Sequence, residues 1–195
     1  MSTRWPDLLT VENFFDQPLC ERVVAELAAA ESSAATVYGR SASGAIDSGV
    51  RRTLRVFPSS ETVELVTGRL WALKDAIEKH FDVSLTECEE PQFLRYRQAD
   101  FFVAHQDGNT GLLRLETERR RISTVIFLSR ESDVPGPGVY GGGSLVLMNH
   151  RPSSNYQPFR VSAEPGTLVA FRSETTHEVT PVTHGERLSI VSWYR

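Results

Sequence analysis

Residues 165–195 read PGTLVAFRSETTHEVTPVTHGERLSIVSWYR, in which short runs rich in β-branched and aromatic residues alternate with polar and turn-forming residues. Runs of roughly four to eight such residues between turn signals are typical of β-strands. The same pattern reaches back to about residue 90, through QFLRYR, DFFVAHQD, RISTVIFLS, SLVLMN and FRVSA. This half of the chain is therefore predicted to form a jelly roll or a sandwich of short strands.

The first half of the chain carries two helical patterns instead. Apolar residues recur at helical spacing over residues 17–30, with Asp16 as the predicted N-cap, and again over residues 60–80. Residues 31–52 lie between them and are rich in Ser, Gly and Ala. They are predicted to form a long mobile loop, of the kind that often serves as a lid or binding segment.

A chain of 195 residues fits one domain. We expect a mainly β fold with flanking helices, in which residues 1–88 supply an N-terminal helical layer on one sheet and the mobile loop 31–52. Residues 89–195 would form the jelly-roll core. Within that core, ESDVPGPGVYGGG at 131–143 is expected to be a loop, because a segment so rich in Gly and Pro suits neither a helix nor a regular strand.

The composition argues against several classes of partner. With a net charge of −4, the chain lacks the basic surface of a typical nucleic-acid-binding protein. No apolar run reaches the roughly 20 residues that span a bilayer, so no membrane partner is expected. The first residues also lack the apolar core of a signal peptide. Cys20 and Cys88 are expected to be free thiols packed as small apolar groups, which suits a cytoplasmic protein.

The first candidate metal ligands are His105 and Asp107, in the stretch FFVAHQDGN. Residues i and i+2 of a strand point to the same face, so one strand can present both side chains. His177 is the best third ligand, because two histidines and a carboxylate form a facial triad that leaves positions open on the metal. Arg187 begins the last strand run, where an inward arginine needs an anionic partner. A dicarboxylate would supply that partner through a bidentate pair.

An ordered set of residues resembles the 2-oxoglutarate- and Fe(II)-dependent dioxygenases, specifically their prolyl 4-hydroxylase-like branch: Tyr96, His105-x-Asp107, Gly142-Gly143, His177, Arg187 and Trp193. The N-terminal segment VENFFDQPLCERVVAEL is also similar to the opening strand and helix of that branch. The resemblance covers most of the chain and is least clear over residues 31–80. H-x-D alone is a weak signal, but in a β-rich chain with the later His and Arg at this spacing it is specific.

This resemblance implies a double-stranded β-helix that uses Fe(II), 2-oxoglutarate and O2, with ascorbate as a further cofactor. His105, Asp107 and His177 would bind the metal, Arg187 would pair with the distal carboxylate of 2-oxoglutarate, and Tyr96 would lie against the co-substrate. The implied reaction hydroxylates an unactivated C–H bond and releases succinate and CO2. In related halogenases a small residue takes the place of the carboxylate, so Asp107 favours hydroxylation.

The chain departs from the branch at three positions. Ala99 stands where glycine is usual. Phe127 and Val191 stand where some members place a tyrosine and a threonine near the distal carboxylate. Binding of the co-substrate would then depend more heavily on Arg187.

The candidate ligands also have plainer interpretations. His105 and Asp107 could be a strand-end pair bonded to turn backbone, and His177 could cap a turn. Arg187 could be an exposed charge and Tyr96 a core residue. Backbone geometry is expected to explain Gly142 and Gly143, core packing to explain Trp193, and solvent exposure to explain the remaining histidines, namely His80, His150 and His184. Gln106 is expected to face away from the site.

Several arginines are weaker candidates. Arg119, Arg120 and Arg121 are expected to form a solvated charge run, with contact to a carboxylate of the co-substrate or substrate as the alternative. Arg51 and Arg52 resemble a segment that faces the peptide substrate in this branch, so they are candidates for substrate binding.

Peptidyl proline is the substrate class that the resemblance favours, and a free amino acid or another small metabolite is the alternative. A hypothesis of a different class is a jelly-roll sensor or scaffold that binds metal or ligand without turnover. A nucleic-acid demethylase is disfavoured by the acidic charge and by Trp193, which stands where a second arginine would be needed. The sequence makes no prediction of the oligomeric state.

Overall fold

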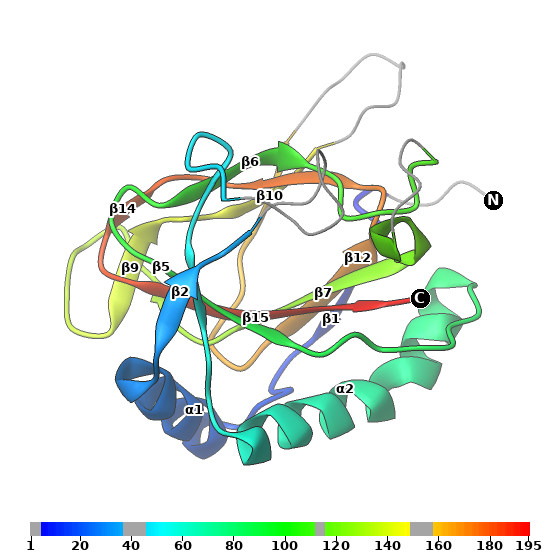
Figure 1. Cartoon of the computed structure of the whole chain (residues 1–195), viewed down its shortest axis with the longest axis horizontal. Helices are drawn as coiled ribbons and strands as arrows, with labels where there is room; N and C mark the ends of the chain where they lie inside the picture. The colour runs from blue at the N-terminus through cyan, green and yellow to red at the C-terminus, as the bar shows by residue number, and fades with distance from the viewer. Residues whose placement is uncertain (1–4, 37–45, 112–115, 149–157) are drawn as a thin grey trace.

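The computed structural model describes residues 5–36, 46–111, 116–148 and 158–195 (Figure 1). Its helices are α1 (Gln17–Ala29), α2 (Ser60–Phe81) and a 3-10 turn (Glu116–Arg119). The strands are β1 (Leu8–Val11), β2 (Ser32–Ala34), β3 (Arg51–Arg52), β4 (Leu54–Val56), β5 (Gln92–Tyr96), β6 (Phe101–His105), β7 (Ile122–Phe127), β8 (Arg130–Glu131), β9 (Val139–Gly142), β10 (Leu145–Met148), β11 (Phe159–Val161), β12 (Leu168–Arg172), β13 (Thr176–Val179), β14 (Val182–His184) and β15 (Arg187–Tyr194).

Two antiparallel sheets face each other across the molecule. In the described part of the chain, the larger sheet has the order β1-β12-β7-β15-β5-β4-β2 and the smaller one β11-β10-β13-β6-β3. A third, short sheet of β14, β9 and β8 lies at one end. Helices α1 and α2 run along the outer side of the larger sheet (Figure 1). The predicted jelly roll, or double-stranded β-helix, with helices on one sheet is confirmed.

The two helices begin and end close to the predicted residues. Asp16 caps α1 by accepting a hydrogen bond from the backbone N–H of Leu19 at 3.0 Å, and Ser59 caps α2 in the same way. Both helices bury their apolar faces in one cluster with the outer face of the larger sheet. Burying each large side chain contributes roughly 1.5–3 kcal/mol, so this cluster holds the helices on the sheet. Among the described residues, neither helix has the length and hydropathy needed to cross a membrane.

Strand β7 shows how the larger sheet is buried on both faces. Ile122 and Ile126 pack toward the helices, whereas Val125 and Phe127 pack toward the smaller sheet. This double burial explains why the segment reads as a nearly continuous apolar run rather than as an alternating one. The inward positions of β7 face the interior between the sheets, and Ser123 is the polar residue among them.

Two segments that were expected to be loops contain strands. Within 31–52, Ser32–Ala34 forms β2 and pairs with β4 at the edge of the larger sheet, and Arg51–Arg52 forms β3. The side chains of β2 are exposed, so the strand leaves no burial pattern in the sequence. Residues 37–45, the middle of the expected mobile loop, lie outside the described residues. Within 131–143, Glu131 belongs to β8 and Val139–Gly142 forms β9, where Gly142 adopts a φ of 65° and the pairing with β14 is irregular.

Ala99 adopts a left-handed backbone conformation in the turn between β5 and β6. Its φ is 67°, and its N–H donates to the carbonyl of Val182 at 2.8 Å. The side chain is exposed, so no packing compensates the strain. For a residue with a Cβ, this conformation costs roughly 1–2 kcal/mol.

The Ala99→Gly substitution should therefore stabilise the protein. Relief of the strain exceeds the extra chain entropy of glycine, about 0.4–1 kcal/mol, so the free energy of unfolding should rise by about 0.5–1 kcal/mol. The measurement is urea denaturation, with a higher midpoint at an unchanged m-value. Ala72→Gly, at an exposed position inside α2, is the matched control and should lower stability by about 1 kcal/mol. A loss of stability in Ala99→Gly would contradict the strain argument.

Candidate metal centre

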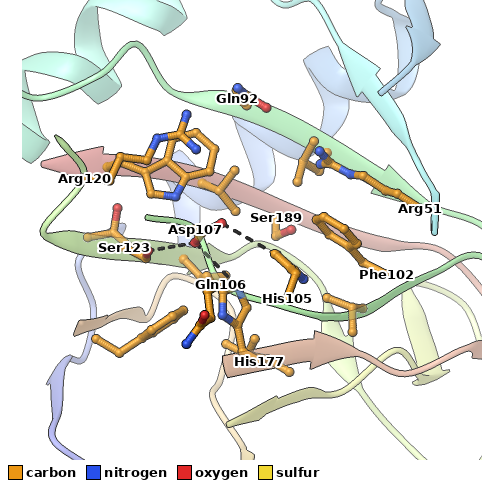
Figure 2. Close-up of a pocket in the computed structure, with 18 of the residues that line it drawn as sticks. Arg51, Gln92, Phe102, His105, Gln106, Asp107, Arg120, Ser123, His177 and Ser189 are labelled. Carbon is orange, nitrogen blue, oxygen red and sulfur yellow. Dashed lines mark hydrogen bonds and ion pairs between the residues drawn. The ribbon is translucent and has the colours of Figure 1, made fainter. Parts of the chain in front are cut away.

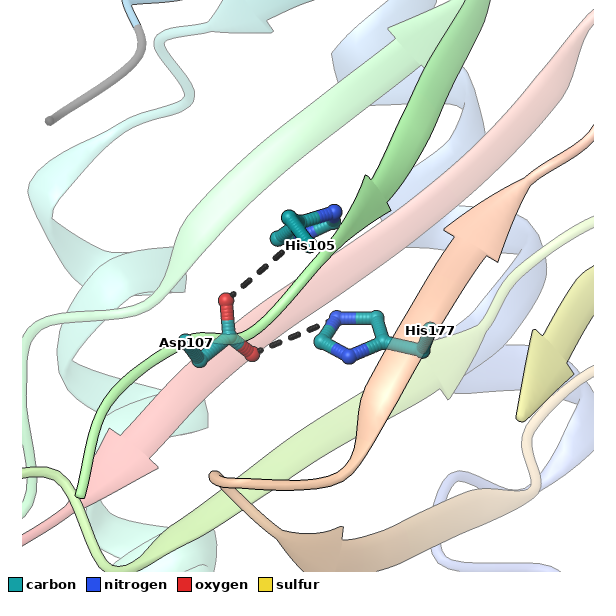
Figure 3. A group of neighbouring side chains, drawn as sticks. All are labelled: His105, Asp107 and His177. Atoms are coloured by element: carbon teal, nitrogen blue, oxygen red, sulfur yellow. Dashed lines mark ion pairs between the residues drawn. The ribbon is translucent and has the colours of Figure 1, made fainter. Parts of the chain in front are cut away.

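His105, Asp107 and His177 come together between the two sheets (Figure 3). His105 is the last residue of β6 and His177 lies on β13, and the antiparallel pairing of these strands sets the two histidines directly opposite each other. Their ring centroids are 4.2 Å apart. One potential ligand atom from each of the three residues lies within 4.8 Å of the other two. The structure therefore brings together the three residues that the sequence offers as metal ligands.

The orientation of both imidazoles is fixed by the backbone. Nδ1 of His105 lies 2.8 Å from the carbonyl oxygen of Val103, and Nδ1 of His177 lies 2.9 Å from that of Thr175. A carbonyl oxygen only accepts hydrogen bonds, so the proton of each neutral ring is assigned to Nδ1. The lone pair of each Nε2 is then free to bind a metal, the arrangement typical of histidine ligands.

Both Nε2 atoms point at the carboxylate of Asp107. The Nε2 of His105 lies 3.6 Å from Oδ1, and the Nε2 of His177 lies 3.4 Å from Oδ2. Neighbouring ligand atoms around an octahedral metal with bonds near 2.1 Å are about 3 Å apart. The three donors therefore fit a divalent metal ion with only small movements.

The electrostatics favour the protonation states that a metal site requires. Burial lowers the pKa of His177 to about 4, and the neighbouring His105 acts in the same direction. Burial alone would raise the pKa of Asp107, but the adjacent His177 and His105 outweigh it and hold that pKa well below its usual range. A neutral imidazole and an ionised carboxylate are the forms that bind metals. Two histidines and one carboxylate are also the donor set of facial-triad iron sites.

Asp107 is positioned differently from the sequence prediction. Strand β6 ends at His105, so Asp107 does not extend from the same strand but lies in the turn that follows. Its N–H donates to the carbonyl of Ser173 at 2.9 Å, and its Oδ2 accepts from the hydroxyl of Ser123 at 2.7 Å. Because the alternation of the strand stops here, Gln106 lines the site rather than facing away, with its amide bonded to the carbonyl of Glu174.

A cavity of about 180 Å³ opens beside the three residues (Figure 2). Arg187 extends into it from the start of β15, opposite Tyr96 of β5, and only 2% of its surface is exposed. Its Nη1 donates to the hydroxyl of Ser189 at 2.8 Å, and its guanidinium lies over the rings of Tyr96 and Phe127. Its Nε has no hydrogen-bond partner, and no acidic side chain that the structure describes pairs with it. A buried, unpaired charge is costly, so this cavity is suited to an anion.

The two candidate arginines of β3 point to different sides. Arg51 lines the cavity and stacks on Phe102 of β6, whose ring in turn stacks on His105 with centroids 3.6 Å apart. Its Nη1 donates to the carbonyl of Thr36, and its Nε has no partner. Arg52 is exposed, lies over Phe101 and does not line the cavity.

Arg120 and Trp193 belong to the cavity wall, and Trp193 is buried as core packing predicts. The guanidinium of Arg120 lies 3.7 Å from the centroid of the Trp193 ring and makes a bidentate pair with Glu89 at 2.7 and 2.8 Å. Arg120 is therefore buried rather than part of a solvated charge run. Sequence reasoning missed Glu89, which carries no motif and lies on a separate segment before β5.

The remaining expected residues lie outside the site. His80 is exposed, as expected, with its Nε2 3.5 Å from Oδ1 of Asp7, and His184 packs against Gly141, with its Nε2 buried. His150 lies outside the described residues. Cys20 and Cys88 are free thiols, as predicted.

Comparison with known proteins identifies the family. Residues 91–195 match the model of the 2OG-Fe(II) oxygenase superfamily. A PKHD-type hydroxylase of Paracoccus denitrificans is 31% identical over 191 residues, which cover 96% of this chain and 75% of the relative. The chain therefore belongs to the 2OG-Fe(II) oxygenase superfamily, whose name states the metal and the co-substrate. It is also similar to a PKHD-type hydroxylase of Burkholderia cenocepacia, with 31% identity over 80% of this chain. The aligned part spans 66% of that relative, just under two thirds of its length.

Solved structures share the fold. A prolyl-4-hydroxylase of Pseudomonas putida superposes with a TM-score of 0.72 at 23% identity, covering 97% of this chain and 92% of the other. A prolyl hydroxylase of Trichoplax adhaerens, solved with a peptide fragment of a hypoxia inducible factor, superposes with a TM-score of 0.67 at 16% identity, covering 96% of this chain and 83% of the other.

Removing His177 should abolish metal binding. His177→Ala deletes a buried metal donor. We expect the affinity of this variant for Mn(II), measured by isothermal titration, to be more than about 100-fold lower than that of the wild type. This exceeds the loss usual when a residue that only hydrogen-bonds a metal ligand is removed. His184→Ala is the matched control, since that histidine lies outside the site, and should bind like the wild type. Equal Mn(II) affinity in the wild type and His177→Ala would refute the site.

Proposed function

We propose that this protein is an Fe(II)- and 2-oxoglutarate-dependent hydroxylase, in which His105, Asp107 and His177 hold the metal and Arg187 holds the co-substrate. The observation that carries the proposal is a buried arginine with no described acidic partner, in the same cavity as the three metal donors. A metal site alone would suit many proteins. A metal site that shares a cavity with an arginine lacking a described acidic partner suits a metal-binding dicarboxylate.

When bound, Fe(II) and 2-oxoglutarate would supply the oxidising chemistry, in which O2 is consumed, 2-oxoglutarate is cleaved to succinate and CO2, and a substrate C–H bond becomes C–OH. The protein's own contribution is positional. Its three donors would hold one face of the metal and leave the opposite positions open. The apolar side chains that line part of the cavity lower the local dielectric, which strengthens charge interactions within it.

Arg187 would bind the distal carboxylate of 2-oxoglutarate. The guanidinium can form a bidentate pair with a carboxylate, and its partnerless Nε is available for it. Ser189 adds a hydroxyl beside the guanidinium. Phe127 and Val191 contribute no hydroxyl, so affinity would depend on Arg187 and on the hydroxyls of Ser189 and Tyr140 that hydrogen-bond it. Tyr96, buried beneath the guanidinium, would lie against the co-substrate.

Peptidyl proline is the substrate class that we propose. Support comes from the names of the related PKHD-type and prolyl hydroxylases and from the cavity wall. Arg51 and Trp193 line the cavity near the metal donors and are proposed to contact the substrate, whereas Arg52 is exposed and would do so only from outside the cavity. The alternative substrate is a free amino acid or another small metabolite.

Two further elements of the proposal rest on weaker support. Ascorbate as a reductant follows from the resemblance to prolyl 4-hydroxylases. A cytoplasmic location agrees with the free thiols of Cys20 and Cys88.

Arg187→Ala should separate co-substrate binding from metal binding. Truncating one partner of a buried charge pair costs 2 kcal/mol or more, so affinity for 2-oxoglutarate should fall by at least about 30-fold. Affinity for Fe(II) should stay within about threefold. The measurement is an anaerobic titration of the Fe(II) protein with 2-oxoglutarate, followed by its visible charge-transfer absorption. Arg130→Ala, which removes an exposed arginine paired with Glu164, is the control. An equal loss of affinity for the metal and for 2-oxoglutarate would show that Arg187 has a structural role only.

Turnover distinguishes the hydroxylase from a sensor or scaffold. Metal-free protein reloaded with Fe(II) and ascorbate should release succinate when a suitable member of a library of proline-containing peptides and free amino acids is added. With that substrate, Arg51→Ala should raise KM about tenfold, because it removes a charged contact worth roughly 1.4 kcal/mol, and should leave 2-oxoglutarate affinity unchanged. If no library member stimulates succinate release, the sensor or scaffold hypothesis is favoured.

A further inference from the structure

Two buried serines, Ser123 and Ser173, form hydrogen bonds around Asp107. The hydroxyl of Ser123, on β7, lies 2.7 Å from Oδ2 of Asp107 (Figure 2) and 3.0 Å from the hydroxyl of Ser173, which follows β12. Ser123 is 1% exposed and Ser173 is fully buried. The main chain of Ser173 adds a second contact, because its carbonyl accepts the N–H of Asp107 at 2.9 Å.

The direction of this hydrogen-bond chain is determined by the carboxylate. An ionised carboxylate only accepts hydrogen bonds, so Ser123 donates to Asp107. The single hydroxyl proton of Ser123 is then used, and its oxygen must accept the proton of Ser173. Each member of the chain Ser173–Ser123–Asp107 thus has one defined role. A hydrogen bond to an ionised acceptor is about twice as strong as one between neutral groups.

The position of Ser123 in β7 has no packing explanation. The next inward-facing residues of the strand are Val125 and Phe127, both part of the apolar core between the sheets. A small apolar residue would suit this position equally well if it only filled space. A hydroxyl is needed here only because the carboxylate of Asp107 lies against it.

We propose that Ser123, backed by Ser173, is a positioning residue that makes Asp107 a one-oxygen metal ligand. This inference rests on the proposed function. The hydrogen bond from Ser123 takes a lone pair of Oδ2, which also faces Nε2 of His177, and this makes Oδ1 the better donor to the metal. A carboxylate that binds through both oxygens would occupy one of the positions that the co-substrate and O2 require. Ser123 therefore keeps the open face of the metal free.

The test uses Mn(II) as the probe and compares Ser123→Ala, Ser123→Thr and Ser173→Ala. Loss of an outer partner of a metal ligand typically weakens binding by about 10- to 100-fold, so this loss is expected for Ser123→Ala. Ser123→Thr keeps the hydroxyl, and because Ser123 lines the cavity the added methyl group has room, so affinity should return to within about threefold of the wild type. The Mn(II) affinity of Ser173→Ala should lie between those of Ser123→Ala and Ser123→Thr. Ser132→Ala, which changes a half-buried loop serine outside the cavity, should bind like the wild type.

A second readout separates positioning from general support. The number of exchangeable waters on bound Mn(II), from the relaxation of water protons, should be one lower in Ser123→Ala at saturating metal, because the released carboxylate would bind through both oxygens. The affinity of Ser123→Ala for 2-oxoglutarate should fall together with the water count. A role limited to folding would change the melting temperature of the metal-free protein but not the water count.

The outcomes distinguish this proposal from the proposed function. If the wild type binds Mn(II) and His177→Ala does not, while Ser123→Ala matches the wild type in affinity and water count, the role of Ser123 is refuted and the metal site stands. Equal weakening in Ser123→Ala and Ser123→Thr would also refute it, because volume rather than the hydroxyl would then matter. If Ser123→Ala does not fold, wild-type affinity in Ser173→Ala together with weakened binding in Ser123→Thr refutes the proposal. If the wild type itself binds no Mn(II), both proposals fail.

Discussion

The pairing of β13 with β6 is the constraint on which the site depends. It sets His177 opposite His105, and the two imidazoles are fixed by the carbonyl of Val103 on β6 and by that of Thr175, just before β13. Backbone carbonyls of this kind are available in any pair of strands. A shift of one residue in the register of β13 against β6, however, would turn one of the two histidines to the other face of the sheet. The two-sheet fold thus provides the site by fixing the register, and the turn after β6 adds Asp107.

The larger sheet supplies the second half of the site from the opposite side. Strand β15 brings Arg187 into the interior, and the helices cover the outer face of this sheet. A guanidinium buried among Tyr96, Phe127 and Ser189 has no described acidic partner. The fold therefore carries an unsatisfied positive charge that a ligand must balance. The cost of a buried charge without a described acidic partner is the physical basis for the proposal that Arg187 binds a carboxylate.

Sequence reasoning predicted most of the site because its residues are few, chemically distinctive and placed at strand ends. It failed where position depends on contacts between distant segments. Asp107 was assigned to a strand, yet it lies in a turn whose backbone is bonded to Ser173. Ser123 lacks any motif, and its role follows only from the approach of Asp107. The sequence did not predict strand β2, because both of its faces are exposed and burial therefore imposes no pattern on Ser32–Ala34.

The most direct test of this account is a crystal structure of the protein grown without oxygen in the presence of Mn(II) and 2-oxoglutarate. The account predicts one metal peak in the anomalous map, bound by Nε2 of His105, Nε2 of His177 and one oxygen of Asp107. It also predicts that the distal carboxylate of 2-oxoglutarate is paired with Arg187. A map with no metal between these three residues, or a co-substrate whose distal carboxylate lies away from Arg187, would contradict it.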